Sequence, residues 1–325
     1  MKVSVIIPIY KVESFIGRCA CSLLEQTLDE MEFIFVDDCS PDGSIQVLEE
    51  VLAYYPSRAK DIRMIHHDRN LGLPAARNTG LKVARGEYVF HCDSDDWVEP
   101  EMLEKLYDAA TENNADIVWC DWYLNFEKSE RYMRQPSYTT PHDALRGILS
   151  GRMKYNVWNK LVRRKLYGNN HIAFPEGHGM AEDMTIIRLF ACASRVCYLP
   201  RAFYHYVRLN ESAFTHAVSE KNRVDMMFNT IETVSYLKDK FGSLFDCELE
   251  WFKLSVKFPL LVSGSRDDYY VWLFIFRESN GFIRSNHNQS LRARLLQQAA
   301  AGGQYWIVWL YYRLVQRLVY GIIYK

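Results

Sequence analysis

The hydrophobic positions of the first 125 residues alternate between short continuous runs and stretches with helical spacing. The continuous runs predict buried strands at residues 3–9, 33–37, 62–66, 88–92 and 117–122. Apolar residues three or four positions apart predict helices at residues 13–26, 44–55, 74–84 and 101–113. This alternation predicts an α/β fold with a mostly parallel sheet that helices cover on both faces.

The pattern becomes less regular after residue 125. Residues 125–140 are polar and predict a loop, and the breakers Pro175, Gly177 and Gly179 predict a second loop at 174–180. The remaining elements expected here are a helix at 143–150, a strand at 156–163 and a helix at 184–194. From about residue 216 onward only helical patterns remain, so we predict a helical C-terminal region over residues 216–325.

The segment Gln304–Lys325 is apolar and aromatic, and a helical wheel gives it a narrow polar stripe. The stripe consists of Arg313, Gln316, Arg317 and Tyr320. From residue 279 to the end the chain holds six Arg or Lys and no Asp or Glu. Basic amphipathic helices rich in Trp and Tyr favour anionic membrane interfaces, so we predict peripheral association with the inner face of the cell membrane. The alternatives are a helix packed on the body and a homodimer interface.

Composition narrows the class of protein. The chain has 325 residues, 49% of them hydrophobic, and a net charge of −1, which argues against nucleic acid as a partner. Its eight cysteines show no C-x-x-C spacing, as expected in a reducing compartment. The apolar N-terminal run is too short for a signal peptide core or a spanning helix. We therefore predict a cytoplasmic location.

Three carboxylates, those of Asp93, Asp95 and Asp96, follow the strand expected at 88–92. Acids this close repel one another unless a cation lies among them, and Mg²⁺ or Mn²⁺ takes oxygen ligands, often shared with substrate phosphates. Ligands of open α/β sheets bind where parallel strands end. The alternative is an acidic turn in which Asp96 caps the next helix. The cluster alone leaves both interpretations open.

Four motifs resemble those of family 2 glycosyltransferases in order and spacing. They are VSVIIPIY at 3–10, VDDCSPDGS at 36–44, NLGLPAARN at 70–78 and DSDD at 93–96. The resemblance covers roughly residues 1–215 and implies an inverting enzyme with the Rossmann-like GT-A fold. It further implies a nucleotide half at about 1–97 and an acceptor half at about 98–215. The helical region 216–325 lies outside it.

The resemblance implies a nucleotide-sugar site in the first half. It places Tyr10 against the base, where the alternative is an aromatic residue packed on the first helix. By resemblance, Asp38 is expected to contact the base too, which most strongly suggests UDP. An acceptor-only carboxylate suits the N3–H of uracil or thymine, and guanine could offer its N1–H instead. No G-x-G-x-x-G follows the first strand, so a dinucleotide site is not indicated. The expected binding set also includes Pro8, Glu13, Asn70 and Ser94.

Further expected roles concern the charged groups of the nucleotide and a metal ion. Arg77, near the start of a helix, is expected to hold anionic or polar parts of the nucleotide, and the alternative is an ion pair with the strand-end acids. By resemblance, Asp93 contacts the ribose and Asp95 coordinates Mn²⁺ or Mg²⁺. His205 is a second candidate metal ligand, with a packed, hydrogen-bonded histidine as the alternative.

Transfer to an acceptor hydroxyl needs a base, and Glu182-Asp183 supplies two acids where a loop meets a helix. The resemblance makes Asp183 the base and Glu182 a supporting residue, with two helix-capping acids as the alternative. Weaker candidates for acceptor or phosphate contacts are Trp158, Lys160 and Arg208.

These features predict an inverting, metal-dependent glycosyltransferase. It would move a sugar from a UDP-sugar to a hydroxyl of a glycan or lipid-linked oligosaccharide in surface polysaccharide synthesis. A non-catalytic nucleotide-sugar-binding scaffold is the main alternative, and retention of Asp93, Asp95 and Asp183 together argues against it. A processive polymer synthase is disfavoured, because no apolar run of about 20 residues could form a channel.

Overall fold

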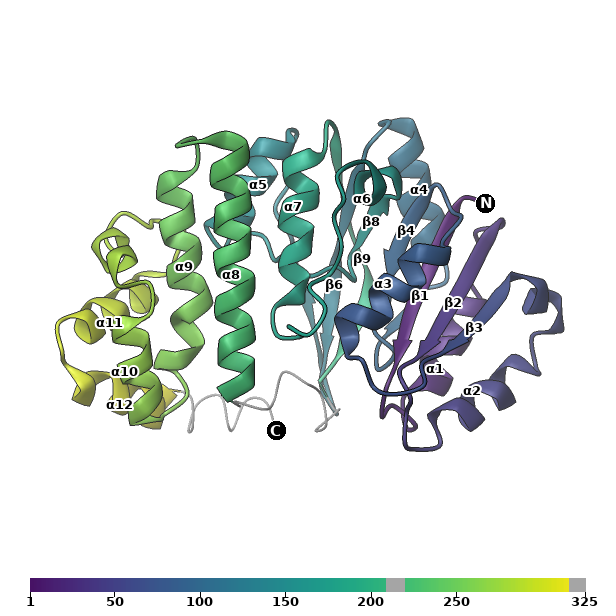
Figure 1. Cartoon of the computed structure of the whole chain (residues 1–325), viewed down its shortest axis with the longest axis horizontal. Helices are drawn as coiled ribbons and strands as arrows, with labels where there is room; N and C mark the ends of the chain where they lie inside the picture. Colours follow the sequence, from purple (N-terminus) through teal and green to yellow (C-terminus); the bar gives the residue numbers. More distant parts are fainter. Residues whose placement is uncertain (209–219, 316–325) are drawn as a thin grey trace. The chain divides into compact units, whose positions relative to one another are not determined.

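The computed structural model describes residues 1–208 and 220–315, which fall into two units. Unit 1 comprises Met1–Asp143 and Tyr155–Asn229, and unit 2 comprises Ala144–Lys154 and Thr230–Lys325. The sheet belongs to unit 1, and unit 2 is helical (Figure 1).

The sheet of unit 1 has nine strands in the order β3-β2-β1-β4-β8-β6-β9-β5, with β7 paired to β6. The strands are β1 (Val3–Ile9), β2 (Met31–Asp37), β3 (Ile62–His66), β4 (Tyr88–His91), β5 (Trp97–Val98), β6 (Ile117–Asn125), β7 (Glu130–Met133), β8 (Lys160–Arg163) and β9 (Val196–Val207). The first four strands pair with one another in parallel, as the strand–helix alternation predicted.

The other half of the sheet is mixed. Strand β8 runs antiparallel to both β4 and β6, whereas β9 runs parallel to β6 with register shifts around Asp121. Strand β7 lies inside the segment 125–140, which was expected to be a loop. The sequence did not predict this strand, because its exposed residues show no alternation of apolar and polar positions. Strand β8 begins at Lys160, so the strand expected from residue 156 is shorter than predicted.

Helices cover both faces of the sheet (Figure 1). The helices of this unit before α8 are α1 (Ile16–Leu24), α2 (Ser44–Leu52), α3 (Leu73–Val83), α4 (Met102–Glu112), α5 (Pro141–Leu149, which continues into unit 2), α6 (Lys165–Asn169) and α7 (Thr185–Cys192), with 3₁₀ turns η1 (Pro56–Asp61) and η2 (Glu182–Met184). Leu23 of α1 and Leu106 of α4 share one apolar cluster with Val5 and Ile7 of β1.

Helix α3 packs on the opposite face. Alternate side chains of a strand point to opposite faces, so Ile6 of β1 faces away from that cluster. Any Cβ at Gly80 of α3 would clash with the Ile6 side chain, so the glycine allows the helix to approach the strand closely. Pro74 lies in the first turn of α3, as predicted. This close approach positions the Arg77 side chain, which projects from the same helix.

The described part of the C-terminal region, residues 220–315, is helical, as predicted. Helix α8 (Glu220–Phe241) begins in unit 1, and its residues from Thr230 onward belong to unit 2. The other elements of unit 2 are α9 (Asp246–Leu261), α10 (Arg266–Phe274), η4 (Arg277–Phe282), α11 (Leu291–Ala301) and α12 (Tyr305–Tyr311). Within residues 1–208 and 220–315, no helix is long and apolar enough to cross a membrane. Of the predicted polar stripe, Arg313 is described, and Gln316, Arg317 and Tyr320 lie outside the described residues.

Candidate active site

The candidate site lies where three neighbouring parallel strands end. The chain builds β1, β2 and β3 outward in one direction and then places β4 on the other side of β1. Ligands of open α/β sheets bind at such a switch point, outside the carboxyl ends of the strands. Asp38 directly follows β2, and the turn that contains Asp93 follows β4.

The turn after β4 is held by a tyrosine from β9. The Tyr204 hydroxyl accepts from the backbone N–H of Asp93 at 3.1 Å and donates to Asp96 Oδ2 at 2.7 Å. The backbone N–H of Val207 donates to Asp96 Oδ1 at 2.7 Å. Asp96 is therefore a buried anchor of this turn and not a helix cap, since α4 begins after Glu101. Burial, and then Asp95 and Asp93, raise the pKa of Asp96 well above its usual value.

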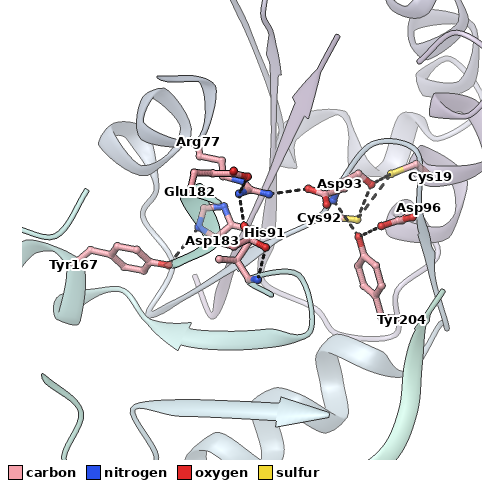
Figure 2. A network of polar contacts seen from close by, with 11 residues as sticks. Cys19, Arg77, His91, Cys92, Asp93, Asp96, Tyr167, Glu182, Asp183 and Tyr204 are labelled. Atoms are coloured by element: carbon pink, nitrogen blue, oxygen red, sulfur yellow. Dashed lines mark hydrogen bonds and ion pairs between the residues drawn. The ribbon is translucent and has the colours of Figure 1, made fainter. Parts of the chain in front are cut away.

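One guanidinium joins this turn to the predicted base. Arg77 is 1% exposed, and its Nη2 donates to Asp93 Oδ1 at 2.9 Å. Its Nη1 donates to Glu182 Oε1 at 2.9 Å and to Asp183 Oδ1 at 2.7 Å. Figure 2 shows the three carboxylates converging on this side chain. The structure thus supports the ion-pair interpretation of Arg77, whose nitrogens Nη1 and Nη2 are committed to protein carboxylates.

The charges in this cluster shift one another. Burial acts to lower the pKa of Arg77, but Asp183, Asp93 and Glu182 outweigh it, and the pKa lies above its ordinary value. Burial, followed by repulsion from Asp183, raises the pKa of Glu182 to about 8 against the opposing effect of Arg77. Burial also raises the pKa of Asp93 to about 6, although Arg77 opposes this shift. Glu182 is therefore largely protonated at neutral pH.

Asp183 lies in η2, between the predicted loop and the predicted helix, which begins as α7 at Thr185. Its Oδ2 accepts from the backbone N–H of Val157 at 3.3 Å, so both oxygens of the carboxylate are oriented. Ala181, two residues before Asp183, has a φ of 66° in the left-handed region, which is an uncommon conformation for a residue with a Cβ. Surrounding contacts must therefore hold this bend.

The predicted nucleotide residues lie at the ends of β1 and β2. Asp38 Oδ1 accepts from the backbone N–H of Leu71 and Oδ2 from that of Gly72, each at 2.8 Å, so Asp38 ties β2 to the start of α3. Tyr10 is 40% exposed and Asn70 is exposed. The Glu13 carboxylate accepts from the backbone N–H of Gly43 at 3.0 Å. Pro8 is buried within β1, and Ser94 is buried in the turn after β4.

His205 is packed and hydrogen-bonded. Its ring stacks between Trp97 and Tyr123, with centroid distances of 3.4 and 4.7 Å. Its Nε2 lies 2.9 Å from a Glu99 oxygen and its Nδ1 lies 3.2 Å from Asn125 Oδ1. These contacts correspond to the alternative interpretation, and they occupy both ring nitrogens, one of which would have to bind a metal.

The weaker acceptor candidates lie in different environments. Trp158 is 6% exposed and stacks on Tyr204 at 4.5 Å, so it belongs to the aromatic core. Lys160 is fully buried and donates to Asn156 O at 2.6 Å, and burial lowers its pKa to about 7. Arg208 is exposed at the end of β9.

Comparison with known proteins identifies the family. The profile described as "Glycosyl transferase family 2" matches residues 4–185, which include every residue of the Arg77 cluster. The chain belongs to this family. Its place in the family is consistent with the order of the strand-end motifs and with the switch-point topology.

Two relatives of this family 2 member come from bacteria. It is 37% identical over 224 residues to the uncharacterized glycosyltransferase EpsJ of Bacillus subtilis, a match that covers 66% of this chain and 62% of that relative. The chain thus spans less than two thirds of EpsJ. It is 32% identical over 278 residues to the cholesterol galactosyltransferase of Borreliella burgdorferi, covering 81% of this chain and 74% of that protein.

A solved structure shares the fold. The crystal structure of Staphylococcus aureus TarS 1–349 in complex with UDP-GlcNAc matches with a TM-score of 0.70 and 24% identity. The match covers 96% of this chain and 92% of that one. The GT-A fold predicted for the family 2 member is therefore confirmed, and the mixed half of its sheet is part of that fold.

Sequence reasoning missed one organising residue of the site, Tyr204. It lies in the mostly buried second half of the long strand β9 and orders the turn after β4 from 108 residues away. Its only signal in the sequence was its place beside the His205 motif, which attracted attention for a different reason.

Proposed function

We propose that this protein transfers a sugar from a UDP-sugar to a hydroxyl of a glycan or lipid-linked oligosaccharide, with inversion at the anomeric carbon. The observation that carries the proposal is the Arg77 cluster. It joins Asp93, on the predicted donor side, to Asp183, the predicted base. A shared, buried cation fixes the two carboxylates relative to each other, as a direct displacement between a bound donor and an acceptor requires.

The donor would lie across the ends of β1, β2 and β4. Tyr10 would stack on the base, with Asp38 accepting from uracil N3–H and Asp93 accepting from the ribose. Pro8, Glu13, Asn70 and Ser94 would shape this site. The UDP-GlcNAc bound by the structural neighbour TarS supports a UDP-sugar, because that neighbour shares the fold over nearly the whole chain.

A divalent cation fits one residue of the turn in particular. Among the described residues, no three His, Cys, Asp or Glu side chains are grouped to hold a metal by themselves. Asp96 points inward to Tyr204, and Asp93 is bound by Arg77, whereas Asp95 is half-buried. As the resemblance to the family implies, Asp95 would hold Mn²⁺ or Mg²⁺ together with the substrate diphosphate and water. The cation would neutralise the departing UDP.

The chain's own residues would move the proton. The acceptor oxygen forms a bond to the anomeric carbon as the bond to the UDP oxygen breaks on the opposite side, and Asp183 takes the hydroxyl proton. Glu182 would hold a proton at neutral pH, since burial raises its pKa to about 8. The base role therefore falls to Asp183, which Arg77 and Val157 orient.

A test uses hydrolysis as a surrogate for transfer, with water as the acceptor. The purified chain is incubated with Mn²⁺ and each of UDP-GlcNAc, UDP-glucose and UDP-galactose, and UDP release is measured. Turnover of at least one donor, absent with EDTA, is the expected result. Tight binding of every donor without turnover, even with a panel of glycan acceptors, would instead support the nucleotide-sugar-binding scaffold.

The acceptor would be reached at the cytoplasmic face of the membrane. Trp306 and Trp309 of α12 are 62% and 43% exposed, and Leu310 and Leu314 are also exposed. Arg313 lies over the Trp309 ring at 4.9 Å, so a cation accompanies the apolar surface. Exposed Trp beside Arg suits the interface of anionic lipids, which supports peripheral binding over a homodimer contact.

A further inference from the structure

The loop that leads into the proposed base is held at its start by α3. Asn78 Nδ2 donates to the carbonyl of Phe174 at 2.9 Å and to Glu176 Oε1 at 3.0 Å. The backbone N–H of Phe174 donates back to Asn78 Oδ1 at 2.9 Å. Asn78 adjoins Arg77, so one turn of α3 fixes both the beginning of this loop and the acids at its end.

The middle of the loop is held by α8, far along the chain. Asp225 Oδ2 accepts from the backbone N–H of Gly179 at 3.1 Å, and its Oδ1 lies 3.1 Å from Nδ1 of His178. Asn229 Nδ2 donates to the carbonyls of His178 at 3.1 Å and Met180 at 2.7 Å. The His178 ring also stacks on Phe228 at 3.7 Å with an interplanar angle of 13°.

These contacts are built into the helix. Asp225 and Asn229 are four residues apart and therefore lie on the same helix face, and they are 2% and 4% exposed. Buried polar side chains of this kind are costly unless they are bonded, and here their partners are mainly backbone groups of one loop. Both residues lie beyond position 185, where the match to the family profile ends.

The bonds reach the bend that aims the base. Met180, whose carbonyl accepts from Asn229, immediately precedes Ala181 with its left-handed φ of 66°. Such a conformation persists only when its surroundings over-determine it. Two residues later comes Asp183. If the bend at Ala181 relaxed, the Asp183 carboxylate would move away from the acceptor hydroxyl, although its hydrogen bond to Arg77 would remain.

We propose that Asp225 and Asn229 are positioning residues for the proposed base Asp183, so that the first turns of α8 complete the active site. This inference rests on the proposed function for the role of Asp183. The hydrogen bonds from Asp225 and Asn229 to the loop, called the clamp below, can be measured independently. The three fixed points, Asn78, the α8 pair and Arg77, then hold the loop along its whole length.

The test substitutes the clamp and measures the loop and the chemistry separately. Asn229→Ala removes both donors to the loop, and Asp225→Asn keeps the shape but removes the charge that faces His178. Asn229→Gln retains an amide donor, and Val224→Ala, at a 54% exposed position of the same helix, is the matched control. Hydrogen–deuterium exchange reports on peptide 174–184, and hydrolysis of the three UDP-sugars with Mn²⁺ reports on turnover.

We expect faster exchange of peptide 174–184 in Asn229→Ala and Asp225→Asn, with exchange elsewhere unchanged. The kcat for hydrolysis should fall by about ten- to a hundredfold, because a small misplacement of a catalytic group has effects of this order. The donor KM and the Kd for UDP should stay at their wild-type values. Asn229→Gln should recover part of the loss, and Val224→Ala should match the wild type.

Two results would overturn the inference. One is wild-type exchange and wild-type kcat in both clamp variants. The other is a parallel loss of kcat, UDP binding and thermal stability, which would indicate a general requirement for folding. If the wild type turns over no donor, either with water or with the panel of glycan acceptors, the proposed function fails by itself, and the exchange of peptide 174–184 still decides whether α8 holds the loop.

Discussion

Nη1 of Arg77 donates to Oδ1 of Asp183 at 2.7 Å, although the two residues are 106 positions apart in the sequence. The same nitrogen reaches Glu182, and the other terminal nitrogen reaches Asp93. A planar guanidinium suits this arrangement because its N–H groups point in fixed directions toward several carboxylate oxygens. The acid after β4 and the acids of η2 therefore share one orienting group.

Replacing Arg77 should affect stability and activity together. Arg77→Met keeps much of the volume but leaves Asp93, Glu182 and Asp183 without the buried cation that they share, and we expect a loss of about 3–5 kcal/mol in the free energy of unfolding. Urea denaturation at pH 7 measures this. Arg195→Met, at an exposed position, should change the free energy by less than about 0.5 kcal/mol. An unchanged free energy of unfolding in Arg77→Met would show that the Arg77 cluster does not stabilise the fold.

Replacing Asp183 should separate binding from chemistry. Asp183→Asn keeps an oxygen that can accept from Val157 but removes the base, so we expect UDP-sugar turnover to fall by about 10²- to 10⁴-fold. Titration calorimetry should give an unchanged Kd for UDP. Glu182→Gln should lose less activity than Asp183→Asn, and the opposite ranking would transfer the base role to Glu182.

The pKa of Glu182 predicts a dependence of stability on pH. Because the folded protein keeps this proton up to about pH 8 and the unfolded chain releases it near pH 4.3, the folded state binds more protons between these values. The Glu182 contribution therefore lowers the free energy of unfolding as pH rises from about 5 to 8, by at most about 1.4 kcal/mol per pH unit. Glu182→Gln should lack this contribution.

Urea midpoints of the wild type and Glu182→Gln across pH 5–8 provide the measurement. The free energy of unfolding of Glu182→Gln, relative to that of the wild type, should increase as pH rises. Asp93, whose pKa burial raises to about 6, is present in both proteins and shifts both curves in the same direction. Parallel curves over the whole range would mean that Glu182 is ionised in the folded protein.

The proposed cation site predicts a metal-dependent effect of UDP. UDP should raise the melting temperature more with Mn²⁺ than with EDTA, because the cation and Asp95 together hold the diphosphate. Asp95→Asn should remove the difference, and Asp68→Asn, at an exposed position, should preserve it. Equal shifts with Mn²⁺ and with EDTA in the wild type would remove the metal from the mechanism.

The exposed surface of α12 predicts binding to anionic vesicles. Trp306→Ser combined with Trp309→Ser should weaken co-sedimentation with phosphatidylglycerol vesicles at least about tenfold. Trp side chains that insert into the lipid interface and nearby Arg side chains both contribute to the affinity for the membrane. Tyr54→Ser, at a position 82% exposed in unit 1, is the control. A change in oligomeric state without a change in vesicle binding would identify α12 as a dimer contact.

In the first half of the chain, local sequence signals predicted most of the strands and helices. The β1–β4 strands and the helices between them were predictable because burial produces continuous apolar runs in the strands and a helical spacing of apolar residues in the helices. Strand β7 was not, because it is exposed and gains its place by pairing with β6. His205 shows the same limit, since nothing near it in the sequence reveals a ring stacked between Trp97 and Tyr123.

The sequence by itself determined the family, the strand–helix series and the acids that end β4 and begin η2, because these are properties of residues close together in the chain. Only the tertiary structure decided that Arg77 binds those acids, that Asp96 faces Tyr204, and that α8 holds the loop before Asp183. The physical reason is that a hydrogen bond depends on distance and direction in space. Packing α3 against β1 and α8 against the loop creates that geometry, and it leaves no period or spacing in the sequence.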